Sequence, residues 1–135
     1  MLSGKRLAKK IAVEAHDKFA SDIELLDVKR RCEFANYFLL MSARNRIHLD
    51  SLREHLLDLA KKSKVTVFGR DGAAASGWIV IDFGDVIVHL FLPETRRFYD
   101  LKSIWGDDTV VDIGLGETPA AQDEPPAKPK RSRKK

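Results

Sequence analysis

The sequence predicts a single α/β domain, built on a mixed sheet of about five strands with flanking helices. Two stretches repeat apolar residues at helical spacing, and short aliphatic and aromatic runs lie between and after them. Helices interspersed with strands are typical of a sheet on which helices pack. The chain has 135 residues, which suits one domain and a core that needs no disulfide.

The first half of the chain predicts a helix, two strands and a second helix. An apolar residue recurs every four positions across residues 7–19, with lysine and glutamate on the other side, as in an amphipathic helix. The short aliphatic run 23–28 predicts a strand. The continuous apolar run 37–42 predicts a strand that is buried on both faces. Leucines at helical spacing predict a helix over residues 48–62, which permits the strands before and after it to run parallel.

The second half predicts three more strands and a short helix, giving the order α-β-β-α-β-β-β-α. Residues 65–68 are expected to form a strand, and the small and polar residues 69–77 a loop. The two β-rich runs that follow form a hairpin. Asp100 is expected to cap a helix over residues 101–105, which ends at Gly106.

The hairpin joins residues 78–83 to residues 86–92 through Gly84-Asp85, and Gly at the first turn position tolerates a positive φ. A two-residue turn sets Phe83 opposite Val86, and opposed residues share a face. One face is then entirely apolar and belongs to the core: Ile79, Ile81, Phe83, Val86, Val88 and Leu90. The other face mixes aromatic, acidic and imidazole side chains: Trp78, Val80, Asp82, Ile87, His89 and Phe91.

Two interpretations of this mixed face stay open from the pattern alone. Large aromatic side chains with a few polar groups are what a protein-binding surface needs, since they give contact area with few rotors to freeze. Alternatively, helices cover this face, and Asp82 and His89 form an internal polar pair.

The net charge of +4 belongs to the C-terminal end of the chain. Residues 1–118 hold 18 basic and 18 acidic residues, whereas residues 119–135 hold six basic and two acidic ones. We therefore expect a folded domain over residues 1–118 and a disordered basic tail over residues 119–135, since Ala, Pro, Lys and Arg cannot bury a core. The tail could contact the phosphates of an RNA, or it could only raise solubility.

The residue types needed for common catalytic and metal sites do not occur in the required patterns. The sequence has no Walker loop and no dinucleotide-binding glycine pattern, so no cofactor is expected. Four histidines, spread over three predicted elements, and the lone Cys32 make no metal signature. The histidines of the helix over residues 48–62 are expected to be solvated at the surface. No apolar run approaches the ~20 residues of a membrane-spanning helix, and we expect a cytoplasmic protein.

A set of motifs in the second half resembles the signature of the ribosomal silencing factor (Iojap-like) family. The resemblance spans roughly residues 7–107, and its motifs are Gly77-Trp78, Asp82-Phe83-Gly84-Asp85, His89, Arg97-Phe98-Tyr99-Asp100-Leu101 and Trp105-Gly106. It departs from the family at Ser42-Ala43-Arg44, where Ser-Gly or Thr-Gly is usual, and in a longer loop over residues 71–76.

The resemblance implies a protein that acts by binding. Members of the family bind a ribosomal protein on the intersubunit face of the large subunit and hinder joining of the small subunit. Relatives in organelles assist large-subunit assembly, and a homodimer is expected in the free state. The family's surface residues carry over to Trp78, Val80 and Asp82, and further to Arg97 and Tyr99. His89 and Trp105 also match the signature, in either a structural or a binding role.

Two other functions are alternatives to this one, a nucleotidyltransferase and an RNA-binding protein. The family's fold resembles that of nucleotidyltransferases, which need a Gly-Ser pair for nucleotide phosphates and closely spaced aspartates for Mg²⁺. The sequence lacks that Gly-Ser pair followed by Asp-x-Asp, and Asp82 and Asp85 flank a turn, so we expect no enzyme. The other alternative is RNA binding, including binding of ribosomal RNA, through the basic tail. A tail without aromatic residues cannot stack on bases.

Overall fold

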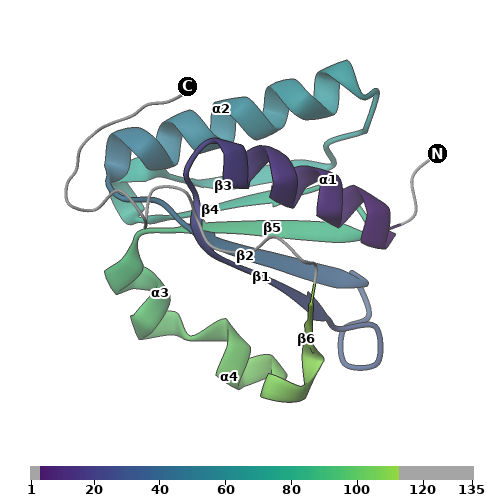
Figure 1. Cartoon of the computed structure of the whole chain (residues 1–135). Coiled ribbons are helices and arrows are strands. Elements are labelled where there is room, and N and C mark those ends of the chain that lie inside the picture. Colours follow the sequence, from purple (N-terminus) through teal and green to yellow (C-terminus); the bar gives the residue numbers. More distant parts are fainter. Residues whose placement is uncertain (1–3, 113–135) are drawn as a thin grey trace.

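A six-stranded mixed sheet organises residues 4–112, the part of the chain that the computed structural model describes. Helices lie on both of its faces (Figure 1). The elements follow in the order α1 (Gly4–Asp17), β1 (Ser21–Asp27), β2 (Tyr37–Ser42), α2 (Arg46–Lys62), β3 (Gly69–Ala73), η1 (Ala74–Ser76), β4 (Trp78–Asp82), β5 (Val86–Phe91), α3 (Pro93–Tyr99), α4 (Leu101–Trp105), η2 (Asp107–Thr109) and β6 (Val110–Val111).

The strands are arranged in the order β3-β4-β5-β2-β1-β6. The two central strands, β2 and β5, run parallel, with Tyr37 opposite Val86 and Ser42 opposite Phe91. The remaining neighbours pair antiparallel. Every residue of β2 and β5 is buried, because helices cover both faces at the centre of the sheet. This explains the continuous apolar run 37–42 in the sequence.

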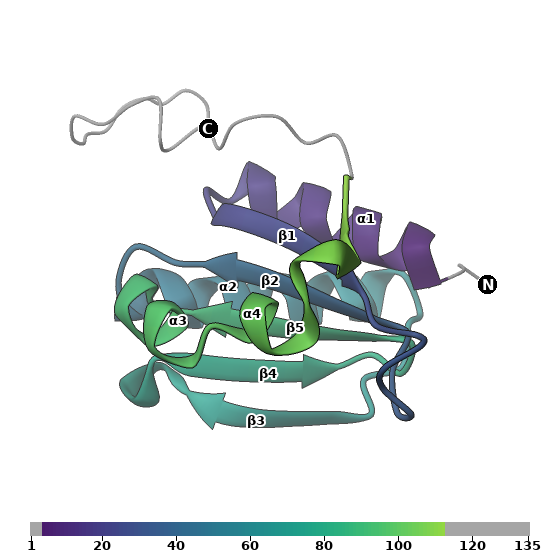
Figure 2. The same ribbon diagram turned by 90° about the horizontal axis from the view of Figure 1, so that it is seen from below.

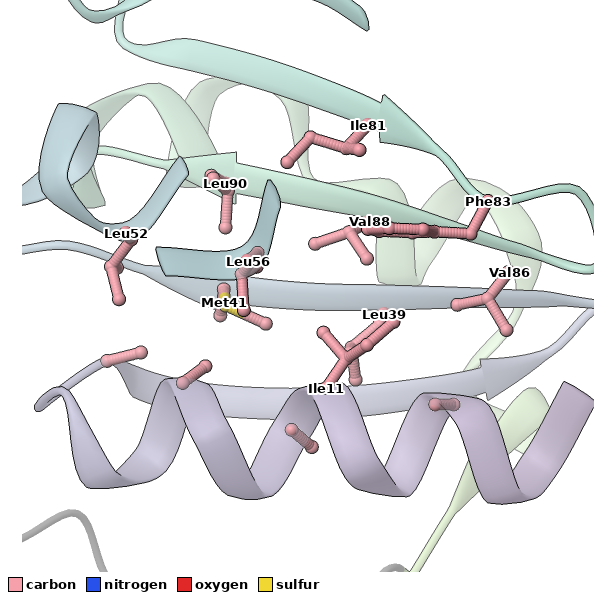
Figure 3. Packing of buried hydrophobic residues seen from close by; sticks show 14 of the residues in the cluster. Ile11, Leu39, Met41, Leu52, Leu56, Ile81, Phe83, Val86, Val88 and Leu90 are labelled. Atoms are coloured by element: carbon pink, nitrogen blue, oxygen red, sulfur yellow. The ribbon is translucent and has the colours of Figure 1, made fainter. Parts of the chain in front are cut away.

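The larger core lies between the sheet and the pair α1 and α2. Both helices bury one apolar side, and Asn45 caps the start of α2 by accepting a hydrogen bond from the backbone N–H of His48. Figure 3 shows Ile11 of α1 and Leu56 of α2 pointing toward Leu39 and Met41 of β2. The opposite face of the sheet carries a smaller cluster, over which α3 and α4 lie (Figure 2).

The predicted α/β class and the relative order of the predicted elements are confirmed, but the third strand was misplaced. Residues 65–68 form no strand, and β3 covers Gly69–Ala73, which was expected to be a loop. Val65 and Val67 instead pack against the core from a connecting segment. Gly72, which pairs with Ile79 of β4, has a φ of +84°, a backbone conformation that residues other than glycine rarely adopt. The position of this strand is therefore determined by main-chain hydrogen bonding to β4, which amino-acid composition does not reveal.

Three other features differ from the expectations. The parallel neighbour of β2 is β5 and not the third strand, which lies at the edge of the sheet. The helix α3 was not predicted, although Pro93 at its first turn is a common helix start. The two-residue strand β6 pairs with β1 and extends the sheet to six strands. The expected basic tail over residues 119–135 lies outside the described residues.

Candidate functional site

The hairpin of β4 and β5 has the predicted register. Trp78 lies opposite Phe91, Val80 opposite His89 and Asp82 opposite Ile87. All six residues of the predicted core face belong to the larger core. The mixed face points to the other side of the sheet, toward α3 and α4, where we find the candidate binding surface.

His89 is the buried polar centre of the mixed face. Its side chain is packed among the rings of Phe38, Trp78 and Phe91, and only 8% of the residue is exposed. The indole Nε1–H of Trp78 donates to Nδ1 of His89 over 3.2 Å. Burial without a compensating charge lowers the pKa of His89 to about 4, so the ring is neutral near pH 7.

The neutral imidazole of His89 carries its proton on Nε2, since Nδ1 accepts a hydrogen bond. Within residues 4–112 no hydrogen-bond acceptor reaches Nε2. The Phe38 ring lies edge-on to the imidazole, with ring centroids 5.1 Å apart. The internal polar pair of Asp82 and His89, which belonged to one of the two interpretations, is not formed. Oδ1 of Asp82 instead accepts from the backbone N–H of Gly84 over 2.7 Å and fixes the hairpin turn.

Helices α3 and α4 cover part of the mixed face. Trp105 packs perpendicular to Phe38, with ring centroids 5.1 Å apart, and Leu101 packs against the same cluster. Ile87, His89 and Phe91 are buried beneath this layer. His89 and Trp105, whose roles the sequence left open, both take part in the packing of this layer. The interpretation that helices cover the mixed face is correct for this half of it.

Trp78 and Val80 are only half-buried and border an exposed aromatic group. The rings of Trp78 and Tyr99 have centroids 4.7 Å apart, and Tyr99 stacks edge-on against Phe98 at 4.9 Å. Phe98 is 80% exposed and Tyr99 44%. We call the group Trp78, Val80, Asp82, Phe98 and Tyr99 the hairpin surface. Sequence reasoning missed Phe98, whose exposure depends on the unpredicted helix α3.

Arg97 does not join the hairpin surface. It is exposed on α3 and lines a surface depression together with Asp22, Ser42 and Lys102, whereas Tyr99 of the same helix turns toward Trp78. Residues two apart on a helix point in different directions. The structure therefore brings together Trp78, Val80 and Tyr99 from the predicted set, sets Asp82 at the turn end of β4, and separates Arg97 from them.

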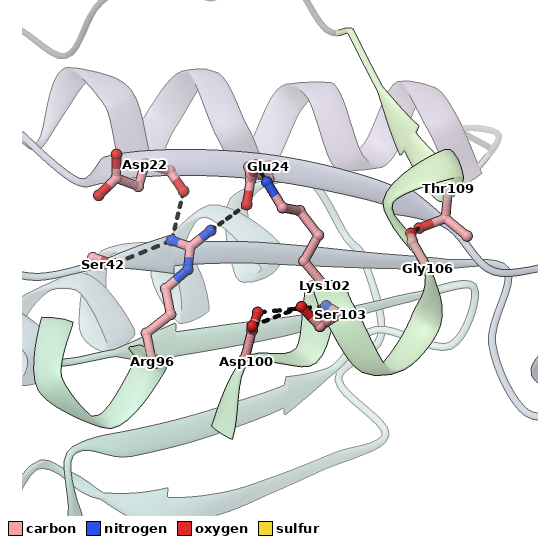
Figure 4. Close-up of polar contacts among 9 residues, drawn as sticks. All are labelled: Asp22, Glu24, Ser42, Arg96, Asp100, Lys102, Ser103, Gly106 and Thr109. Atoms are coloured by element: carbon pink, nitrogen blue, oxygen red, sulfur yellow. Dashed lines mark hydrogen bonds and ion pairs between the residues drawn. The ribbon is translucent and has the colours of Figure 1, made fainter. Parts of the chain in front are cut away.

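Arg96 ties α3 to the sheet. Its guanidinium donates to the carbonyl of Asp22 over 2.6 Å, to Oγ of Ser42 over 3.1 Å and to Oε1 of Glu24 over 2.7 Å (Figure 4). Lys102 of α4 donates to the other carboxylate oxygen of Glu24 over 3.0 Å. Neither helix contains a fully buried residue. These ion pairs, with Leu101 and Trp105, hold the helical layer in place.

The far end of the helical layer is fastened by Arg31, which precedes β2. Its guanidinium bonds both carboxylate oxygens of Asp108, over 3.0 and 2.8 Å, and also donates to the carbonyl of Trp105. The Arg31 hydrogen bond holds the pKa of Asp108 below its usual value. At the start of α4, the Asp100 carboxylate accepts from Oγ and the backbone N–H of Ser103, which also lowers its pKa.

His48 proves to be structural, contrary to the expectation that it is solvated. Its Nε2 lies 2.7 Å from the carbonyl of Lys18, and its Nδ1 accepts from the backbone N–H of Arg44 over 3.0 Å. It thereby joins the end of α1 to the start of α2, and burial lowers its pKa. Cys32 is buried.

Within residues 4–112, no group of three or more His, Cys, Asp or Glu side chains is placed to hold a metal ion. The helices of the same region are too short or too polar to cross a membrane.

The fold and site define an α/β domain with a partly exposed aromatic surface over a structural histidine. Comparison with known proteins gives its family. Residues 2–135 match the family described as "Ribosomal silencing factor during starvation" (RsfS). The ribosomal silencing factor RsfS of Bacillus subtilis is 30% identical over 115 residues, which covers 85% of this chain and 98% of that protein. The chain therefore belongs to the RsfS family, as its motifs predicted.

A second relative and a solved structure extend the comparison. The mouse protein "Mitochondrial assembly of ribosomal large subunit protein 1" is 31% identical over 110 residues, and the chain spans 47% of its length. A crystal structure of a protein from Chromobacterium violaceum superposes with a TM-score of 0.74, covering 78% of this chain and 88% of that one at 24% identity. That likeness concerns the fold.

Proposed function

We propose that this chain represses translation by binding the large ribosomal subunit and blocking the small subunit from joining it. The partner is a ribosomal protein on the intersubunit face, and the mechanism is steric occlusion in the cytoplasm. No covalent bond is made or broken in this mechanism. Family membership supports the proposal, as does the printed name of the mouse relative, which concerns assembly of the large ribosomal subunit.

The contact between Trp78 and Tyr99 is the observation that carries the proposal. Two large rings with centroids 4.7 Å apart form a partly exposed aromatic patch over the sheet, whose strand β5 is fully buried. The hydrogen bond from Trp78 to His89 fixes the indole before any partner arrives. A preorganised aromatic anchor loses little entropy on binding, and Trp and Tyr are enriched among residues that dominate interface energies.

The acidic and apolar neighbours of these rings define the partner's chemistry. Val80 extends the apolar patch along β4, and Asp82 places a carboxylate at its end. A complementary surface therefore presents an apolar pocket for Trp78 and a basic or hydrogen-bond-donating group near Asp82.

Trp78→Ala tests the proposal directly. The variant is expected to weaken binding to isolated large subunits by about 2 kcal/mol or more, because the anchor is lost. Co-sedimentation with purified subunits through sucrose measures the affinity. Light scattering during mixing with small subunits then measures reassociation. Reassociation that proceeds unhindered at saturating wild-type protein would contradict the proposed function.

Two further variants separate a lost contact from a lost fold. Tyr99→Ala removes an exposed ring from the same patch and is expected to weaken binding as well. Ile47→Ala removes an apolar side chain that is 83% exposed on α2, on the other side of the sheet, and is expected to bind like the wild type. Thermal unfolding of each variant checks that the domain is intact.

The proposal has three smaller parts. Occupancy of the large subunit also serves its assembly, which depletion of the protein in cells would reveal as an accumulation of large-subunit precursors. The free protein pairs as a homodimer, and analytical ultracentrifugation measures this state. Incubation with Mg²⁺ and labelled nucleoside triphosphates is expected to give no transfer. A transferred label would favour the nucleotidyltransferase alternative.

A further inference from the structure

The outer side of α1 carries a concentrated positive charge. Lys5, Arg6, Lys9 and Lys10 are all exposed and lie on the side of the helix opposite its buried residues. Residues 4–10 contain no acidic side chain. Since residues 1–118 are neutral overall, this face is a local feature and does not reflect a general excess of basic residues.

This arrangement is unfavourable for the helix itself. Lys5 and Lys9 are four residues apart, as are Arg6 and Lys10, and like charges at this spacing repel each other. The first turn holds basic residues and no acidic one, although the N-terminus of a helix favours negative charge. Local choices that work against stability are expected where a function requires them.

Acidic side chains of the domain do not neutralise these lysines. Within residues 4–112, no carboxylate lies within ion-pair distance of Lys5, Lys9 or Lys10. These three lysines are therefore positive charges without a carboxylate partner among the described residues, and they lie close together on one helix.

We propose that this face of α1 binds the phosphate backbone of ribosomal RNA on the large subunit, while the hairpin surface on the other side of the sheet docks on a ribosomal protein. The proposal rests on the function proposed above. Successive cations on one side of the helix are about 6 Å apart along its axis, so they can follow consecutive phosphates of a strand. Arg and Lys contacts of this kind position a protein without reading sequence.

The geometry favours RNA over a lipid surface. Helices that bind membranes insert an apolar side among the acyl chains. The apolar side of α1 is already buried in the core through Leu7, Ile11 and Ala15. The start of α1 also lies at the hairpin end of the sheet, because Gly4 packs against Tyr37 and Asp85. The hairpin surface lies across the sheet from α1, so protein docking and RNA contact use different residues of the domain.

The test is the triple variant Lys5→Gln, Lys9→Gln and Lys10→Gln in the full chain, with the tail unchanged. Glutamine has a helix propensity close to that of lysine. Binding to purified large subunits is measured across KCl concentrations from about 50 to 200 mM. Losing three phosphate contacts should reduce the salt slope by about two, so the wild type loses roughly 10- to 20-fold more affinity than the variant over this range.

A matched control changes the same charge elsewhere. Lys61→Gln, Lys62→Gln and Lys64→Gln act at and just beyond the end of α2 and should leave the salt slope at its wild-type value. An unchanged slope in the α1 variant, with normal binding of the wild type, would overturn the RNA contact and leave the proposed function standing. Absence of wild-type binding at every salt concentration would overturn both.

Two further measurements test lipid binding and the integrity of the fold. Vesicles of equal parts phosphatidylcholine and phosphatidylglycerol replace the subunits in one arm. An α1 variant that loses vesicle binding but keeps its subunit salt slope would overturn the RNA contact. Lys5→Glu provides the fold check, because an acid in the first turn should raise the unfolding midpoint while weakening subunit binding. Stronger or unchanged subunit binding by Lys5→Glu would also overturn the proposed RNA contact.

Discussion

Burial of His89 couples the stability of the domain to pH. An unfolded histidine titrates near 6.5, whereas the pKa of His89 in the fold is lowered to about 4 by burial. As pH falls from 6.5 to 4, the unfolded chain takes up a proton that the folded chain excludes. Stability is therefore highest above pH 6.5 and falls toward pH 4 by about 3 kcal/mol from this residue.

His89→Phe should remove this component of the pH dependence. Urea unfolding at pH 7, 5.5 and 4.5 measures the free energy of unfolding of both proteins. The variant is expected to be less stable at pH 7 by about 1 kcal/mol, since Nε1–H of Trp78 loses its acceptor. It should then lose less stability than the wild type as the pH falls. Parallel pH profiles would contradict the burial argument, and His55→Gln on α2 serves as the control.

At the residue scale, the sequence predicted the hairpin register but not which of its residues stay exposed. Period-two alternation assigns Trp78 and Phe91 to one face, which the structure confirms. Tertiary packing then separates them, because Phe91 is buried while Trp78 is half-exposed beside Tyr99. The position of Tyr99 depends on α3, whose short pattern gave no helical repeat to detect. Arg97 and Tyr99 were carried over together from the family's motif, which does not record that their side chains point in different directions on α3.

At the scale of elements, the helical layer of α3 and α4 depends on Arg96 more than on burial. Arg96→Met should lower the free energy for opening this layer by about 2 kcal/mol, since three hydrogen bonds from a charged group are lost. Hydrogen exchange read by mass spectrometry should show α3 and α4 exchanging roughly 30-fold faster.

The neighbouring arginine provides the control for that measurement. Arg97→Met changes an exposed side chain on the same helix and should alter stability by no more than about 0.5 kcal/mol. Equal acceleration in both variants would mean that the loss of charge, and not the Arg96 contacts, loosens the layer.

The edge strand β3 depends on one glycine. A Cβ on Gly72 would lie 2.1 Å from the carbonyl oxygen of Trp78, and the φ of +84° is strained for any other residue. Gly72→Ala should therefore destabilise the domain by about 1 to 3 kcal/mol. Gly69→Ala in the same strand meets nothing within 4 Å and should be neutral or slightly stabilising. Thermal unfolding of the two variants distinguishes them, and equal losses would contradict the assignment.

The strand β3 also shows why sequence patterns predicted the long elements correctly but not the short ones. The helices α1 and α2 repeat apolar residues over several turns, and β2 is a continuous apolar run, so each pattern is long enough to read. The strand β3 consists of Gly, Arg, Asp, Gly and Ala, with four of its five residues exposed. Its partner β4 supplies the pairing, which no local pattern records.

At the scale of the whole molecule, the sheet separates two surfaces of different chemistry. The hairpin surface lies on the side of α3 and α4, and the basic side of α1 lies on the other (Figures 1 and 2). Aromatic docking supplies most of the specificity of such a protein, whereas phosphate contacts supply salt-dependent affinity and orientation. A sheet buried on both faces at its centre keeps these surfaces in a fixed relation.

Because the two surfaces share no residue and the sheet lies between them, their contributions to subunit binding should add. Trp78→Ala, the α1 triple lysine variant and their combination are compared in co-sedimentation with large subunits at one salt concentration. The loss in the combination should equal the sum of the separate losses to within about 0.5 kcal/mol. A combination that binds more than about tenfold better than this sum would mean that both changes disturb one shared contact, which would contradict a bipartite interface.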